Sequence, residues 1–180
     1  MPLETWFIFD LGNTVIKLAY ERVLENICRN ASMKRDALVD LLEKPGGYRG
    51  SLRDFQALWA DFFDGPMPGI EDLLDRVRAR YRVAFLSNSN EVHAEVIPRK
   101  YAAIFRRDDR FVFSHRFRCA KPDPEIFRRA LEVIGARPQQ TIFVDDMVEN
   151  VIAARALGMK AYQYGDALSL TEELVRDELL

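Results

Sequence analysis

Hydrophobic residues along the chain gather in short runs that are separated by polar residues and glycines. Five runs are rich in β-branched or aromatic residues, and most lack polar alternation, which is typical of strands covered on both faces. The predicted strands are Thr5–Phe9, Arg82–Leu86, Phe111–Phe113, Thr141–Val144 and Lys160–Tyr164. Because they recur at intervals along the chain, we expect them to belong to one sheet.

Amphipathic helices are predicted in the intervals between these strands. Apolar residues recur with helical spacing in Pro68–Ala79, Pro124–Ile134 and Met147–Leu157. Asp123 is a suitable N-cap for the second helix, and Gly158 stands where the third needs a C-cap. Alternating strands and helices predict an α/β fold with a doubly wound parallel sheet.

The segment from Ile16 to Gly65 breaks this alternation. It carries three apolar stripes with helical spacing and no convincing strand, and we expect an inserted helical cap at the carboxyl edge of the sheet. We therefore predict an α/β core of residues 1–15 and 66–180, with a small cap of residues 16–65 and a hinge at residues 65–69. The stripes are Tyr20, Val23, Leu24, Ile27 and Cys28; Ala37, Leu38, Leu41 and Leu42; and Phe55, Leu58, Trp59, Phe62 and Phe63.

Composition excludes several classes of partner. The chain has 26 Lys and Arg against 28 Asp and Glu, a net charge of −2, which argues against a nucleic acid or an anionic membrane as partner. The two cysteines, Cys28 and Cys119, are far apart, so a disulfide scaffold and a structural zinc site are not expected. No pattern marks a large interface, which favours a monomer or a weak homodimer.

The amino-terminal apolar run, Trp6–Phe9, is too short for a signal peptide or a membrane span. We therefore expect a cytoplasmic location with no membrane association. A reducing compartment also fits the sparse use of cysteine.

Polar clusters follow the first four predicted strands. They are Asp10 with Leu11-Gly12-Asn13-Thr14, then Ser87-Asn88-Ser89-Asn90, Lys121-Pro122, and Asp145-Asp146. Each is ordinary alone, because such residues also form turns and helix caps. Parallel strands bring all four to one edge, however, and that convergence predicts a shared site.

This combination of residues suits phosphoryl transfer. Asp10, Asp145 and Asp146 would repel one another without a cation, and oxygen ligands suit Mg²⁺. Lys121 adds a positive charge, while Ser87 and Asn88 add neutral donors. Positioning and charge neutralisation provide most of the catalysis in such reactions, and a carboxylate can attack phosphorus.

The four clusters, in this order, resemble the four motifs of the haloacid dehalogenase-like hydrolase superfamily, most of whose members are Mg²⁺-dependent phosphatases. The resemblance covers essentially the whole chain. The clusters, together with Asn150, look closest to phosphatases of the α-D-glucose-1-phosphate phosphatase type, and more distantly to the phosphatase domain of epoxide hydrolases. The resemblance implies a small phosphorylated metabolite, such as a sugar phosphate, as the substrate.

The resemblance also implies a role for each residue of the site. Asp10 is expected to be the nucleophile and a metal ligand. The metal set is Asp10, the Gly12 carbonyl, Asp146 directly, and Asp145 directly or through water. Ser87, Asn88 and Lys121 are expected to hold the phosphoryl group, and Thr14 to order the loop after Asp10 and help bind phosphate.

Gly12 departs from the pattern of most phosphatases in the superfamily, which have an aspartate there as general acid and base. His93, on the helix after the second cluster, is a candidate replacement, but we favour a lone surface histidine, and His115 is interpreted likewise. Seven basic residues between Arg99 and Arg118 are interpreted as a solvated face, with attraction of anionic substrates as the alternative.

Two alternatives to a phosphatase stay open. A metal-independent 2-haloacid dehalogenase also lacks the second aspartate of the first motif, although it does not need the acidic pair Asp145-Asp146. A catalytically weak protein that binds a phosphorylated ligand is supported only by Gly12.

Overall fold

The computed structural model describes residues 5–19, 21–22, 25 and 63–180 of the chain. The chain divides into two compact units, Met1–Lys17 with Gly65–Leu180, and Leu18–Asp64. The helical stripes predicted between residues 20 and 63 lie almost wholly outside the described residues, so the helical cap stays a prediction. The first unit contains the sheet and all the predicted site residues.

Five parallel strands form the central sheet of this unit, in the order β5-β4-β1-β6-β7. All five predicted strands are confirmed, and each differs from its prediction by one residue at one end. The strands are β1 (Trp6–Phe9), β4 (Arg82–Ser87), β5 (Arg110–Phe113), β6 (Thr141–Asp145) and β7 (Lys160–Gln163). The doubly wound α/β fold predicted from the sequence is therefore confirmed.

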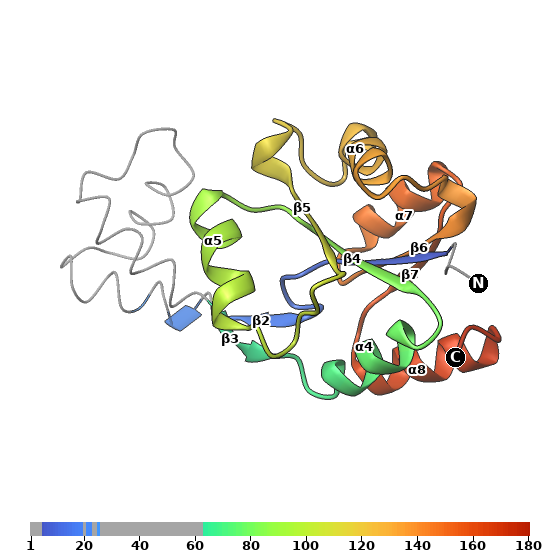
Figure 1. The fold of residues 1–180 in the computed structure, drawn as a ribbon, viewed down its shortest axis with the longest axis horizontal. Coiled ribbons are helices and arrows are strands. Elements are labelled where there is room, and N and C mark those ends of the chain that lie inside the picture. Colours follow the sequence, from blue (N-terminus) through green and yellow to red (C-terminus); the bar gives the residue numbers. More distant parts are fainter. Residues whose placement is uncertain (1–4, 20, 23–24, 26–62) are drawn as a thin grey trace. The chain divides into compact units, whose positions relative to one another are not determined.

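Helices cover both faces of the sheet (Figure 1). The helices α4 (Ile70–Arg78) and α8 (Ala167–Arg176) pack together on one face, and α6 (Pro124–Ile134) and α7 (Val148–Ala156) on the other. Helix α5 (Glu91–Lys100) follows β4. The predicted caps are present: the Asp123 side chain accepts a hydrogen bond from the Glu125 N–H, and Gly158 has a left-handed φ of 87° just after α7.

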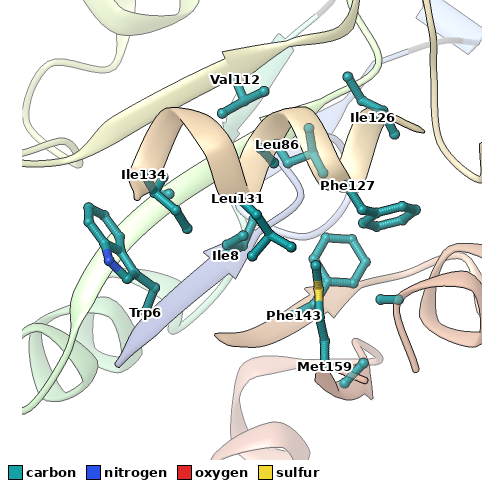
Figure 2. Close-up of a cluster of buried hydrophobic side chains, with 14 of the residues drawn as sticks. Trp6, Ile8, Leu86, Val112, Ile126, Phe127, Leu131, Ile134, Phe143 and Met159 are labelled. Carbon is teal, nitrogen blue, oxygen red and sulfur yellow. The ribbon is translucent and has the colours of Figure 1, made fainter. Parts of the chain in front are cut away.

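A cluster of buried hydrophobic side chains forms the core on the α6–α7 face. Figure 2 shows Trp6 and Ile8 of β1 on this face together with Phe127 of α6 and Phe143 of β6. The rings of Phe127 and Phe143 meet edge to face with centroids 5.2 Å apart. Because β1 is buried on both faces, its residues form an uninterrupted apolar run, which is how the sequence revealed it.

Two short strands were missed by the sequence analysis. β2 (Ile16–Leu18) and β3 (Phe63–Pro66) pair as a two-stranded sheet, so the expectations of no strand between residues 16 and 65 and of a helical Phe63 are wrong. The Met67 N–H also donates to the Val15 carbonyl at 2.9 Å. Strands of three or four residues carry too little periodicity to detect, and pairing between distant segments stabilises them.

No helix in the part of the chain that the structure describes is long and apolar enough to cross a membrane.

Candidate active site at the carboxyl edge of the sheet

The three central strands bring their polar ends together. Phe9 lies opposite Phe85 on one side and Val144 on the other, so β4 and β6 flank β1. The Asp10 N–H donates to the Val144 carbonyl at 2.8 Å, which places Asp10 beside Asp145. The carboxyl ends of strands where the winding reverses are the usual ligand site of an open α/β sheet.

Lys121 joins two of the carboxylates at this edge. Its Nζ donates to Asp10 Oδ1 at 2.5 Å, to Asp145 Oδ2 at 2.6 Å and to the Leu86 carbonyl at 3.0 Å. The Lys121 side chain is only 2% exposed. Burial lowers the pKa of its ammonium, but Asp10 and Asp145 raise it more, so the net shift is upward. Lys121 is therefore a fixed positive charge within the site.

Asn88 holds the backbone of Lys121 with both atoms of its amide. Its Oδ1 accepts from the Lys121 N–H at 2.8 Å, and its Nδ2 donates to the Lys121 carbonyl at 2.9 Å. The amide thus joins the loop after β4 to the segment that supplies the lysine.

Ser114 fixes the same loop from the other side. Its Oγ accepts from the Ser89 N–H at 3.0 Å and donates to the Ser89 carbonyl at 3.4 Å. Ser114 is buried and directly follows β5. The sequence analysis did not identify Ser114. Its position directly after a predicted strand, at the same edge of the sheet, could have indicated it. Together with Asn88 it orders the backbone around Ser87, which is itself buried at the end of β4.

Asp145 is fully buried, and its carboxylate is engaged on both sides. Oδ2 binds Lys121, while Oδ1 accepts from the Met147 N–H and from Asn150 Nδ2, each at 2.9 Å. Asp145 thus positions Lys121 while its carboxylate accepts three hydrogen bonds in all.

Negative charge is in excess at this edge. Burial raises the pKa of Asp10 to about 6; Lys121 opposes the shift, and Asp145 and Asp146 add to it. Burial also raises the pKa of half-buried Asp146, and the Asp145 charge raises it further. When ionised, three carboxylates and one ammonium carry a net charge of −2, the amount that a divalent cation neutralises.

The donor atoms are of the kind that Mg²⁺ prefers, but they do not form a complete metal site. Among the described residues, no three or more His, Cys, Asp or Glu side chains are placed to hold a metal ion. Asp10 and Asp145 share the Lys121 ammonium, and Asp146, next to Asp145 in sequence, adds its charge. Mg²⁺ usually takes one or two carboxylates and keeps several waters or substrate oxygens, so two carboxylates and a backbone carbonyl are sufficient.

The loop after Asp10 is closed by its own backbone. The N–H groups of Val15 and Ile16 donate to the Leu11 carbonyl, and the Asn13 N–H donates to the Ile16 carbonyl. Asn13 has a left-handed φ of 53°, which asparagine tolerates better than most residues. Thr14 is fully buried, and its hydroxyl has no hydrogen-bond partner in the described part of the chain. Its predicted phosphate contact stays a prediction.

His93 is buried, so the interpretation of a surface histidine is wrong. It lies on the inward face of α5 with Ala94 and Ile97. Burial, followed by the charge of His115, lowers the pKa of His93 to about 4. His115 is partly exposed, with Nε2 3.2 Å from Glu91 Oε2. His93 is therefore neutral near pH 7 and cannot replace the missing general acid as an imidazolium.

We expect His93 to make folding sensitive to acid. Its pKa is about 4 in the folded chain against 6.5 for the free side chain, so the unfolded state binds more protons between these values. Stability contributed by neutral His93 is complete above pH 6.5 and is lost as the pH falls toward 4. Between pH 7 and pH 4.5, the free energy of unfolding measured with urea should fall by about 2–3 kcal/mol more for the parent protein than for His93→Gln. Equal losses would contradict this assignment.

The basic residues between Arg99 and Arg118 are exposed, which agrees with a solvated face. Part of this charge is neutralised nearby, since Arg106 lies 3.1 Å from Asp75. The residues in question are Arg99, Lys100, Arg106, Arg107, Arg110, Arg116 and Arg118.

Comparison with known proteins agrees with this fold. Residues 53–158 match the family model of haloacid dehalogenase-like hydrolases. A HAD family enzyme from Bacteroides thetaiotaomicron, solved with magnesium and inorganic phosphate as an Asp12Ala mutant, has a TM-score of 0.70 and 27% identity, covering 90% of this chain and 94% of that one.

Two curated relatives carry phosphatase names. The sesquiterpene phosphatase astK of Aspergillus oryzae is 46% identical over 54 residues, which span 30% of this chain and 28% of that protein. The D-ribitol-5-phosphate phosphatase of Bacteroides thetaiotaomicron is 20% identical over 93% of this chain and 95% of its own length. The family model covers more than half of the sequence, and the chain belongs to the haloacid dehalogenase-like hydrolases.

Proposed function

We propose that this protein is a Mg²⁺-dependent phosphatase that hydrolyses a small phosphorylated metabolite through a phosphoaspartate on Asp10. The observation that carries the proposal is the Asp10 carboxylate, held at the carboxyl edge by Lys121 in a site with an excess of negative charge. The phosphatase names of two relatives, and the magnesium and phosphate in a similar structure, support it.

Asp10, Asp146 and the Gly12 carbonyl are the groups that would hold Mg²⁺, with Asp145 as a further ligand directly or through water. Bound there, the metal would neutralise charge on the phosphoryl oxygens. An acidic pair is not needed for metal-independent dehalogenation, so Asp146 favours the phosphatase over the dehalogenase.

The reaction requires two displacements at phosphorus. An Asp10 oxygen attacks phosphorus, the bond from phosphorus to the ester oxygen breaks, and the leaving alkoxide takes a proton. A water molecule then attacks phosphorus, the bond to Asp10 breaks, and inorganic phosphate leaves as the carboxylate is restored. Lys121, tied to Asp10, stabilises the charge on the phosphoryl group in both steps.

Most phosphatases of the family have an aspartate where this chain has Gly12. Both the protonation of the leaving group and the deprotonation of the attacking water therefore lack that carboxylate. His93 is neutral and buried, so another acid, water or the substrate itself would supply the proton for the leaving group. A positioned acid and base typically contribute about 10²–10⁴-fold to the rate. Turnover should therefore be slower than in relatives with an aspartate there, and fastest for substrates with good leaving groups.

One relative and the predicted cap support a substrate class. A sugar phosphate or polyol phosphate is the class we favour, in line with the name of the relative that matches along nearly its whole length. Residues 16–65, as a helical cap, would exclude water and select the leaving group.

A phosphate-release assay over a panel of phosphomonoesters, with Mg²⁺ and with EDTA, tests the proposal. We expect release that requires Mg²⁺ and stops in EDTA. Asp146→Asn should raise the Mg²⁺ concentration for half-maximal activity by about tenfold or more, because it removes a charged ligand. Asp123→Asn, which changes an exposed helix cap, should leave this Mg²⁺ concentration unchanged.

Two results would count against the proposal. Halide release from 2-haloacids in EDTA, without phosphate release, would identify the dehalogenase. Stabilisation of the folded protein by Mg²⁺ and phosphate, with no turnover of any ester, would identify a binding protein.

A further inference from the structure

Helix α7 carries apolar side chains on its exposed face. Val148 and Ile152 are 50% and 59% exposed, and Ala156 is exposed as well. Because they are spaced four residues apart, the three form one ridge along the helix. A single exposed apolar residue is ordinary, whereas a contiguous row on one helix is a candidate contact surface. The opposite face of α7 packs into the core through Asn150, Val151 and Ala154.

Two charged residues flank this ridge, one on each side. Glu149 and Arg155 stand three residues before and three residues after Ile152. At 100° per residue they therefore lie about 60° to either side of Ile152 around the helix. The Glu149 side chain is exposed and has no ion-pair partner among the residues that the structure describes.

Arg155 is restrained on its side of the ridge. Its Nε and Nη2 donate to the Ala161 carbonyl, at 3.0 and 2.6 Å. These bonds fix the guanidinium beside the helix and leave Nη1 for a further acceptor. The ridge is thus bordered by a negative charge near its start and a positive charge near its end.

The spacing of the ridge favours one packing geometry. Ridges of residues four apart interlock when two helices cross at about −50°. When two copies of α7 cross at Ile152 with this angle, twofold symmetry turns Glu149 of each copy toward Arg155 of the other. An antiparallel pair would instead place Glu149 of both copies on the same side, where their charges repel. The face is therefore complementary to itself at the angle that its ridge favours.

We propose that the exposed face of α7 binds a second copy of this chain in a twofold pair centred on Ile152. A second copy is the partner that fits, because the one patch supplies both members of each charge pair. A helix of nine residues offers less area than the roughly 800 Å² per partner of a stable interface. We therefore expect a weak dimer, with a dissociation constant between about 10 μM and 1 mM. The interface does not depend on the proposed phosphatase activity.

Sedimentation velocity of the full chain, from micromolar to millimolar concentration, tests the interface. We expect the mean mass to rise from that of one chain toward that of two. Ile152→Lys should raise the dissociation constant by at least about tenfold, because it places two cations at the crossing point. Leu168→Lys, a matched change at an apolar position of α8 that is 70% exposed, should associate as the parent does.

Three results would refute the interface. The first is the mass of a single chain at every concentration. The second is association that Ile152→Lys leaves unchanged, and the third is equal weakening by Ile152→Lys and Leu168→Lys. Urea unfolding at micromolar concentration, where the parent is a single chain, verifies that each variant is folded.

An exchange of charges tests the packing angle. Glu149→Arg and Arg155→Glu should each weaken association by about threefold or more, because each sets like charges together at two places in the pair. The double variant Glu149→Arg/Arg155→Glu restores opposite charges, and its dissociation constant should return to within about threefold of that of the parent. A double variant that associates more weakly than either single variant would refute the proposed pairing.

Discussion

Asp10→Asn is expected to lower phosphate release by at least about 10⁴-fold, because an amide nitrogen and a neutral carbonyl cannot replace the attacking carboxylate. The same substitution should raise the free energy of unfolding. Burial and the neighbouring carboxylates raise the pKa of Asp10 to about 6 despite Lys121, so the ionised form is destabilised in the folded chain. A neutral side chain of the same shape removes that destabilisation.

Phosphate release and urea unfolding, measured on the same preparation, check both effects. Asp72→Asn, the same chemical change at an exposed position of α4, should alter neither. Loss of activity together with a large loss of stability would show that Asp10 is mainly structural. Retained activity would remove it as the nucleophile.

The fold was largely predictable from the sequence because burial on both faces leaves a clear pattern. β1 and β6 are buried throughout, and their runs of apolar residues could belong only to covered strands. β2 and β3 lack such a pattern, because each has three or four residues and is stabilised by pairing across a long interval. Helix α8 was also missed, although Asp166 is a suitable N-cap whose side chain accepts from the Ser169 N–H.

The residues of the candidate site were predictable from the sequence, but the contacts that each side chain makes were not. Asp10 and Lys121 come after strands and Asp145 ends β6, and the parallel sheet brings them together. The amide of Asn88, by contrast, holds the backbone of Lys121, a contact that the sequence did not indicate. A side chain's partner depends on local geometry that residue type and spacing do not specify.

His93 illustrates a second limit. Its position on α5 was correctly inferred, but the burial of that helix face depends on which segments pack against it. One polar residue on an otherwise apolar face is compatible with either a buried or an exposed side chain. Only the packed structure shows that the imidazole is neutral.

Lys121→Met is expected to impair both folding and catalysis, for separable reasons. Methionine fills similar space but leaves Asp10 and Asp145 buried without their shared cation. Breaking a buried ion pair by removing one partner costs about 3–5 kcal/mol, which urea unfolding should detect. Phosphate release should fall by about 10³-fold or more, because the phosphoryl charge loses a fixed ammonium in a water-poor site.

The double variant Lys121→Met/Asp145→Asn distinguishes these two reasons. The Asp145→Asn change removes one of the two buried carboxylate charges that lack a cation. The asparagine side-chain oxygen can still accept from the Met147 N–H. The free energy of unfolding should therefore recover by a substantial part of the loss. Activity should not recover, because Asp10 and the phosphoryl group still lack the lysine. If activity returns along with stability, Lys121 acts only by holding the site together, and its assigned part in phosphoryl transfer is wrong.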